Sequence, residues 1–427
     1  MESVEEKKVV PRKKKPAVLV KPTQPKSIFK PKRVEKPRLL NYDKINFSPN
    51  AVYLYLNRFL IQIGIGLYGL FGVIFFFEKF SNSIEKVLIM YTILYFIFVI
   101  GTHLGAKIIH RIGMKKMMII AIFFLFGTVF SLFLWDENPF LFLITFSTFF
   151  ILYKSFYWVP YHVEFAEFTN KKTRGKQMAI LSNISEAALA VLPIIGGLII
   201  SSRGYEVVFL ISSIVVFTSI IPLFFIKETK ERYTWGIKIL VKELFQKENR
   251  GVVWSNLGNG VQNAVGTLIW PIFIFIILKG NYLSVGLITS ITIIALITLR
   301  FAIGNALDNM SKGRILKFGS IFYTTGWIIK IFVETGTGVF LSHTYHNFGK
   351  VVNQLSFDSE IYEQAADNGH YVDEYTVLKE TSLILGKGIM FLVSIPIVMF
   401  LGITATFALA AVATLFMTLA SNKVRVD

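Results

Sequence analysis

The chain has 427 residues, of which 53% are hydrophobic and only 17% are charged, and 41 of them are phenylalanine. This composition excludes an assembly of ordinary soluble domains and indicates a membrane protein. The sequence contains no cysteine, which excludes disulfides, thiolate metal sites and a cysteine nucleophile. The formal net charge of +18 lies mainly in the N-terminal tail and in alternate connections, a pattern that indicates membrane orientation rather than nucleic-acid binding.

Residues 1–47 are rich in lysine, arginine and proline and poor in aromatic residues. We expect this tail to be disordered, because so few apolar groups cannot offset the entropy lost on ordering. It lacks the apolar stretch of a secretory signal peptide. We interpret it as a solvated cytosolic tail, with binding to anionic lipid headgroups as a second reading. No nucleic-acid partner is expected.

Apolar runs of about 20 residues, each long enough to cross a bilayer as a helix, then follow one another as far as residue 420. Their residues do not alternate between apolar and polar as the strands of a membrane barrel do. The sequence therefore predicts an all-α integral membrane protein with about twelve transmembrane helices. The predicted spans are 50–77, 86–106, 116–135, 139–164, 177–201, 205–226, 251–279, 283–307, 314–334, 337–358, 376–400 and 402–420.

The charged, helix-prone stretch 227–250 separates the first six spans from the last six. After the first span, the even-numbered connections carry most of the lysine and arginine. Because cationic loops stay in the cytosol, we expect both termini and this stretch to lie on the cytosolic side of the plasma or inner membrane. The predicted divisions are a tail 1–47, an N-terminal bundle 48–226, a linker 227–250, a C-terminal bundle 251–420 and a C-terminus 421–427.

Two sites recur at nearly the same offset, as expected for a duplicated six-helix unit. The connection after the second span reads AKIIHRIGMKK from Ala106, and the connection after the eighth reads GNALDNMSKGR from Gly304. His110 and Asp308 are the equivalent positions, 198 residues apart. The stretches LSNIS and LKETS begin 197 residues apart, in spans five and eleven. We therefore expect two pseudo-symmetric six-helix bundles.

At these connections the chain resembles the major facilitator superfamily, and the resemblance covers residues 48–420. The family signature there has the form G-x-x-x-D-R-x-G-R-K, which the first copy keeps in part, with Ala106 and His110 in place of Gly and Asp. The resemblance implies a cytosolic charge latch that favours the outward-facing state. The latch residues carried over are His110, Arg111, Gly113, Gly304, Asp308 and Arg314.

The fifth span contains ALAVLPIIGG, which resembles the exporter signature G-x-x-x-G-P-x-x-G-G of the same superfamily. Pro193, Gly196 and Gly197 match that signature, whereas Ala188 and Leu192 do not. Proline removes a helical hydrogen bond, and glycine lets helices bend or approach closely. The arginine motif of proton-coupled drug exporters is missing from the fourth span. Export is therefore favoured only slightly over uptake.

Polar side chains follow one face each of spans one, four, seven and ten, which in the superfamily line a central cavity. Charges in hydrocarbon are costly and normally face a cavity or a partner. Spans three, six, nine and twelve, by contrast, read as almost purely apolar across their centres. The predicted cavity residues are Asn57, Lys154, Tyr157, Trp158, Tyr161, Asn259, Gln262, Asn263, His346, Asn347, Lys350, Asn353 and Gln354.

Two roles are open for Lys154 and Lys350, which are predicted either to bind an anionic group of a substrate or to neutralise charge between helices. Glu186 in span five is the candidate for proton coupling, because a carboxylate kept from water can load and release a proton as access alternates. The alternative for Glu186 is a static pair with a lysine. The histidines of span ten are interpreted as hydrogen-bonding residues, and no metal or cofactor is expected.

The sequence has no G-x-x-x-x-G-K-[ST], H-E-x-x-H or G-x-S-x-G motif, so we expect neither ATP hydrolysis nor catalysis of these classes. The predicted function is that of a monomeric secondary transporter, which moves a small organic solute through the lipid bilayer by alternating access. Two alternatives are a membrane-embedded lipid-modifying enzyme and a scaffold or sensor that acts through the basic tail.

Overall fold

The computed structural model describes residues 47–169, 177, 185–229, 236–308, 312–367 and 372–421. All regular structure within these ranges is helical. The described helices belong to one compact unit, Tyr42–Asp427. Those before the linker are α1 (Pro49–Lys79), α2 (Ile84–Ile112), α3 (Met114–Phe133), α4 (Pro139–Phe168), α6 (Leu192–Arg203), α7 (Tyr205–Thr218) and α8 (Ile220–Leu223).

The second set begins with the linker helix α9 (Ile237–Phe245). It continues with α10 (Arg250–Ala264), the π segment η2 (Val265–Ile269), α11 (Trp270–Ile277), α12 (Tyr282–Asp308), α13 (Lys312–Ile331), α14 (Gly336–Asp367), α15 (Val372–Leu401), α16 (Ala405–Phe416) and the 3₁₀ turn η4 (Met417–Ser421). We call α1–α8 the N-terminal half and α10–η4 the C-terminal half.

Nine helices in the described part of the chain are long and apolar enough to cross a membrane, which confirms the predicted all-α membrane fold. Helices α13, α14 and α16 occupy the positions of the three other predicted spans. Polar residues such as Lys330, His343 and His346 make α13 and α14 less apolar, and α16 is short.

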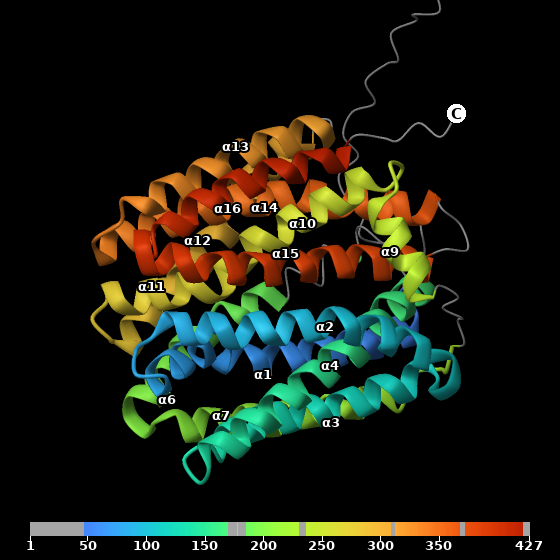
Figure 1. Ribbon diagram of the computed structural model, residues 1–427, viewed down its shortest axis with the longest axis horizontal. Helices are drawn as coiled ribbons and strands as arrows, with labels where there is room; N and C mark the ends of the chain where they lie inside the picture. The colour runs from blue at the N-terminus through green and yellow to red at the C-terminus, as the bar shows by residue number, and fades with distance from the viewer. Residues whose placement is uncertain are drawn as a thin grey trace, which may run out of the picture. The chain divides into compact units, whose positions relative to one another are not determined.

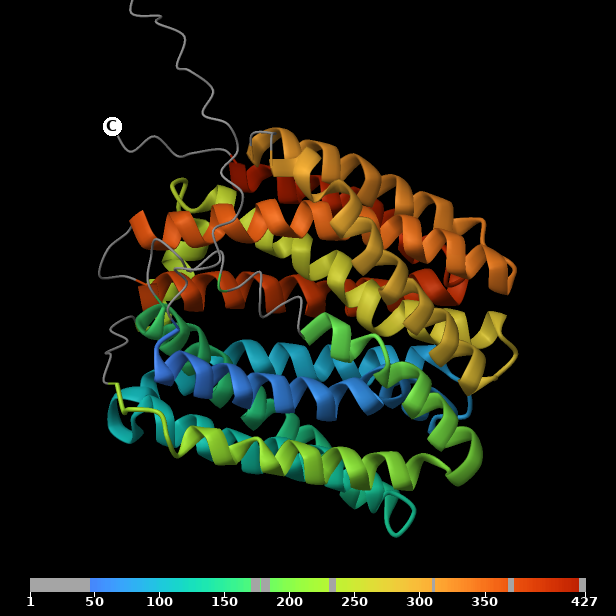
Figure 2. The same ribbon diagram turned by 180° about the vertical axis from the view of Figure 1, so that it is seen from behind.

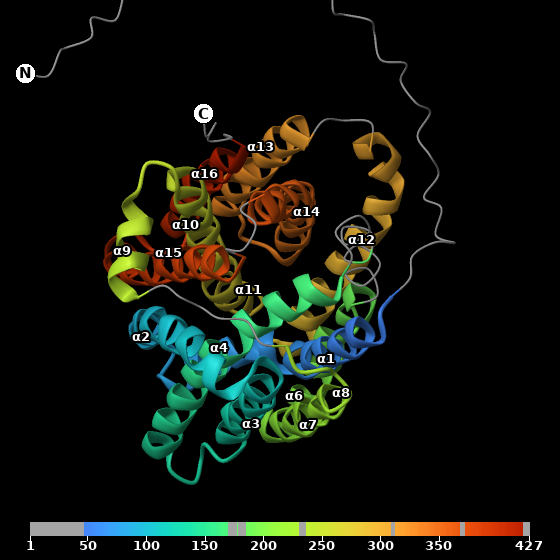
Figure 3. The ribbon, with the colours of Figure 1, turned by 90° about the vertical axis from the view of Figure 1, so that its right-hand side faces the viewer.

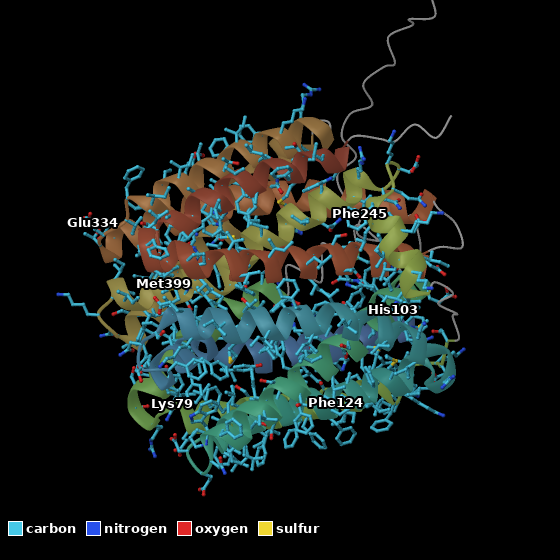
Figure 4. All side chains as sticks on the ribbon, in the orientation of Figure 1. Lys79, His103, Phe124, Phe245, Glu334 and Met399 are labelled. Atoms are coloured by element: carbon cyan, nitrogen blue, oxygen red, sulfur yellow. The ribbon has the colours of Figure 1, made fainter. Side chains whose placement is uncertain are left out.

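The helices of the two halves lie side by side, with α1–α8 on one side and α10–α16 on the other (Figures 1 and 2). Figure 3, which looks roughly along the helices, shows the same two groups. We call the end at which α1 begins and α9 lies the linker end, and the opposite end the distal end. In Figure 4, Lys79, Glu334 and Met399 lie toward the distal end, whereas His103 and Phe245 lie toward the linker end. The halves meet mainly where α2 packs along α15 and α6 packs along α12.

A polar link joins three helices inside the N-terminal half. The sixth span is broken at Ser219, between α7 and α8, three residues before Pro222, which has no N–H to donate. The side-chain amide of Asn57 on α1 donates to the Ser219 carbonyl oxygen at 2.7 Å. The Tyr157 hydroxyl on α4 in turn donates to the Asn57 side-chain oxygen at 2.8 Å. Asn57 therefore satisfies a carbonyl next to the break in the helix.

The turn between α2 and α3 carries the first copy of the loop signature. Gly113 has φ of 90° there, a conformation that costs glycine little and other residues more. Lys115 donates to the carbonyl oxygens of Phe224 and Ile226, at 2.7 and 2.8 Å. These two bonds satisfy carbonyl groups at the end of the sixth span, so this part of the signature ties the N-terminal half together.

Helices α10 and α15 approach each other closely inside the C-terminal half. A Cβ atom at Gly386 would lie 2.2 Å from the Leu257 carbonyl oxygen, and one at Gly260 would lie 2.2 Å from the Leu383 carbonyl oxygen. Such distances leave no room for a side chain. Small residues at a membrane helix interface let the backbones approach and pack in this way.

Replacing Gly386 with alanine should therefore lower the free energy of unfolding by about 1–3 kcal/mol, the usual cost of overpacking. Thermal unfolding of the purified protein in detergent measures this change as a lower melting temperature. Gly236→Ala is the matched control, because a Cβ atom there has nothing within 4 Å. Equal melting temperatures for the two variants would contradict the close packing of α10 against α15.

Candidate functional site

A cavity of about 440 Å³ lies between the two halves. Residues of α1, α2, α3 and α4 line it on one side, and residues of η2, α11 and α15 line it on the other. Gly266, Thr267 and Leu268 of the π segment form part of the wall. Pro271 follows within one turn. It has no N–H, so it cannot donate the hydrogen bond that the Thr267 carbonyl oxygen would accept in a regular α-helix. π segments occur frequently at functional sites.

Each half contributes one lysine to this cavity, Lys154 from α4 and Lys387 from α15. The lining residues, which all fall in the described part of the chain, include no aspartate or glutamate. Two basic side chains and no acidic one therefore line the cavity.

Aromatic rings lie near both lysine side chains. Nζ of Lys154 lies 5.4 Å from the ring centroid of Trp158 and 5.5 Å from that of Phe150. Nζ of Lys387 lies 5.6 Å from the ring centroid of Tyr95. A ring face attracts a cation without neutralising it, so the lysines keep their capacity to bind an anion. The aromatic lining residues are Tyr68, Phe76, Tyr91, Tyr95, Phe146, Phe150, Tyr153 and Phe391.

A polar contact crosses from α4 to α15 nearer the linker end. Oε1 of Glu380 lies 3.6 Å from Nε2 of His162 and 3.6 Å from Nζ of Lys379. On the same side of α4, the Arg58 guanidinium lies 4.7 Å from the ring centroid of Trp158. Glu380 is thus a carboxylate surrounded by cationic or titratable side chains from both halves.

A carboxylate clasp joins the halves at the distal end. Glu78 at the end of α1 accepts hydrogen bonds from the hydroxyls of Tyr205 and Tyr282, each at 2.6 Å. Tyr205 begins α7 in the N-terminal half, whereas Tyr282 begins α12 in the C-terminal half. One oxygen of Glu78 therefore holds its own half together, and the other holds the two halves to each other.

The motif of the fifth span lies beside this clasp, where α6 packs on α12. A Cβ atom at Gly197 would lie 2.6 Å from the Tyr282 carbonyl oxygen, and one at Gly286 would lie 2.3 Å from the Pro193 carbonyl oxygen. The Ile194 amide also donates to the Ser290 hydroxyl across the same contact, at 3.2 Å. Gly196 packs instead on α1 of its own half. The two halves thus touch through backbone at the distal end.

Several predicted cavity residues lie inside one half. Asn57 and Tyr157 form the polar link described above. Gln262 accepts a hydrogen bond from Tyr323 on α13 and donates to the Asn259 side-chain oxygen at 2.7 Å. Two further predicted cavity residues also contact α13. Asn353 donates to the Ser320 hydroxyl at 2.6 Å, and the His346 ring packs on Tyr323 and Trp327.

Other predicted site residues are half-buried. The predicted cavity residue Lys154 lines the cavity between the halves. The half-buried residues are Trp158, Tyr161, Glu186, Asn263, Asn347, Lys350 and Gln354. Of these, Asn347 lies 3.1 Å from a ring nitrogen of His343. A role of these residues in substrate binding, and of Glu186 in proton coupling, stays a prediction.

The predicted latch lies at the linker end. Arg111 and Arg314 are exposed there. Gly304 lies within α12, whose last residue is Asp308. The side chains of His110 and Asp308 lie outside the described part of the chain, so the latch between the halves also stays a prediction.

Sequence reasoning missed two charged groups that the structure makes prominent. Lys330 was expected to lie in an almost purely apolar span, yet it is 1% exposed, with Nζ 3.9 Å from the ring centroid of Trp270 and 4.4 Å from that of Trp327. Trp327 precedes Lys330 by three residues, which was a signal for this contact. Glu78 at the end of an apolar span gave no comparable signal, because both of its partners are distant in sequence.

Comparisons with known proteins agree with this architecture. A family model described as Major Facilitator Superfamily matches residues 54–344. A search among curated proteins gives no match. The structure is similar to a crystal structure of a POT family transporter in complex with 5-aminolevulinic acid, with a TM-score of 0.64 and 12% sequence identity, over 86% of this chain and 94% of that one. At this identity the likeness shows the fold alone. Because the match to the family model covers more than half of the chain, the chain belongs to the Major Facilitator Superfamily.

Proposed function

We propose that this multi-pass membrane protein is a secondary transporter that moves a small organic solute by alternating access. The observation that carries the proposal is the cavity walled by residues from both halves. A site between two bundles reaches one side of the membrane or the other when the bundles rock about it. The proposed energy source is a gradient of the substrate or of protons.

The distal contacts supply the gate that such a cycle needs. Backbone packing between α6 and α12 and the bond from Tyr282 to Glu78 hold the distal end closed. Both contacts cross from one half to the other, so both must break when this end opens. We place the linker end in the cytosol, because the cationic connections lie there. Export is proposed over uptake on the helix-five signature alone.

Transport itself is tested in vesicles reconstituted with purified protein. Uptake of labelled organic solutes should depend on the protein and should respond to an imposed pH gradient. Turnover of a lipid by the purified protein in detergent, with no vesicles present, would instead favour a membrane-embedded enzyme.

The clasp predicts that Tyr282→Phe opens the distal end. Removing a hydrogen bond to a charged group costs about 1.5–3 kcal/mol, so the open population should rise roughly 10-fold or more. The chain has no cysteine, so Thr267→Cys in the cavity wall provides a single reporter. A membrane-impermeant maleimide should label this cysteine faster from the distal side in the Tyr282→Phe background.

Tyr205→Phe is the matched control for this experiment. It removes a bond of the same length to the same carboxylate within one half, and it keeps the ring that packs against Tyr282 of the other half. Its labelling rate should stay near that of the protein with both tyrosines. Equal acceleration by the two substitutions would show that the clasp does not act between the halves.

Glu186 is the proposed proton-coupling residue. Glu186→Gln keeps the size of the side chain and removes its charge, so it should abolish accumulation driven by a pH gradient and leave exchange of substrate for substrate intact. The two activities are compared in the same vesicles, with and without the gradient. Loss of both to the same extent would assign Glu186 a structural role instead.

A further inference from the structure

We propose that Lys154 and Lys387 together form a binding site for an amphipathic organic anion, in which one anionic group bridges the two halves and an apolar or aromatic body lies against the surrounding rings. This inference rests on the proposed transport function and gives it a substrate class. Three features of the cavity carry it, namely its charge, its walls and the origin of its two lysines.

The charge of the cavity selects for anions. Two ammonium groups line it, and its lining residues include no carboxylate. Glu380 lies two turns before Lys387 on α15, but it is already shared with His162 and Lys379. A cationic solute would meet net repulsion here, whereas a carboxylate or phosphate would offset charges that now repel each other.

The walls select for an organic body. Eight of the 21 lining residues are aromatic, and most of the others are aliphatic or glycine. Aromatic rings pack well against flat apolar groups, whereas a bare inorganic ion would leave these faces without a partner. The volume of about 440 Å³ falls within the range of small-molecule sites, roughly 300–1,000 Å³. A small molecule with a ring or a short apolar body at one end and an anionic group at the other fits both features.

The positions of the two lysines couple binding to the arrangement of the halves. Lys154 belongs to α4 in the N-terminal half, and Lys387 belongs to α15 in the C-terminal half. Their like charges repel across the interface, which works against the approach of α4 and α15. An anion between them replaces repulsion with two attractions. Bound anion therefore favours the closed arrangement of the halves, and its release favours their separation.

The direct test measures binding of three probes to purified protein in detergent. Benzoate, phenylphosphate and benzenesulfonate carry different anionic groups on the same ring, and benzamide is their neutral counterpart. At least one of the three anions should raise the melting temperature in a saturable manner, while benzamide should not. Acetate and inorganic phosphate test whether the ring is needed. The proposal would be overturned if benzamide raised the melting temperature as much as the best anion does. It would also be overturned if none of the three anions raised the melting temperature.

Variants assign the binding to the two lysines. Lys154→Gln and Lys387→Gln should each raise the Kd of the best anion by roughly 10- to 100-fold, since a hydrogen bond to a charged group contributes about 1.5–3 kcal/mol. Lys387→Arg keeps the charge and should restore most of the affinity. Lys317→Gln is the matched control, because this lysine is exposed on α13. Wild-type affinity in both Lys154→Gln and Lys387→Gln would contradict the site.

A vesicle experiment separates failure of this inference from failure of the transport function. Protein-dependent uptake of a neutral or cationic solute, unaffected by any of the three anions, would refute the anion site and leave transport standing. Saturable anion binding that needs both lysines, with no movement of any solute across the vesicle membrane, would support the site and refute transport. Anion binding should also slow labelling of Thr267→Cys from the distal side.

Discussion

Charge kept between membrane helices is the constraint on which the arrangement of this molecule depends. A cation in hydrocarbon needs a partner or a polar space, and Lys154, Lys330 and Lys387 all lie within membrane helices. Aromatic rings supply much of the compensation, as Trp270 and Trp327 do for Lys330. Lys154 and Lys387 instead face the cavity at the boundary between the halves.

The two kinds of contact between the halves differ in what they require of the sequence. The contact of α6 with α12 depends on backbone approach, which Gly197 and Gly286 permit by having no side chain. The Glu78 clasp depends on hydrogen bonds that are directional and can exchange for water. Close backbone packing and a few polar bonds suit a contact that forms and breaks repeatedly in the proposed transport cycle.

The sequence predicted the fold well because hydropathy reports burial in lipid directly. Each predicted span coincides with a helix in the described part of the chain, and this includes the polar α14. The site was predicted less well because a polar residue on one helical face can turn toward a cavity or toward a neighbouring helix. Gln262 and Asn353 turn toward α13, where Tyr323 and Ser320 bind them. The spacing of polar residues along a helix does not distinguish a cavity from a neighbouring helix, because both arrangements turn the same helical face inward.

Lys154 and Lys387 show the opposite case. Lys154 is the one lysine in the sequence of α4, and Lys387 lies on α15, which also carries Lys379. The cost of charge in lipid indicates that each faces something other than hydrocarbon. That they face the same cavity follows only from the pairing of α2 and α4 with α15, which involves contacts between distant parts of the chain.

The hydrogen bond from Asn57 to Ser219 fixes a place where the chain would otherwise bend. Helices in membranes commonly kink near proline, and the sixth span is interrupted just before Pro222. The Asn57 amide fastens the interrupted backbone to α1, and the Tyr157 hydroxyl fastens Asn57 to α4. These bonds brace the N-terminal half across the interruption, so that in the proposed transport cycle movement falls on the contacts with the other half rather than on bending within this one.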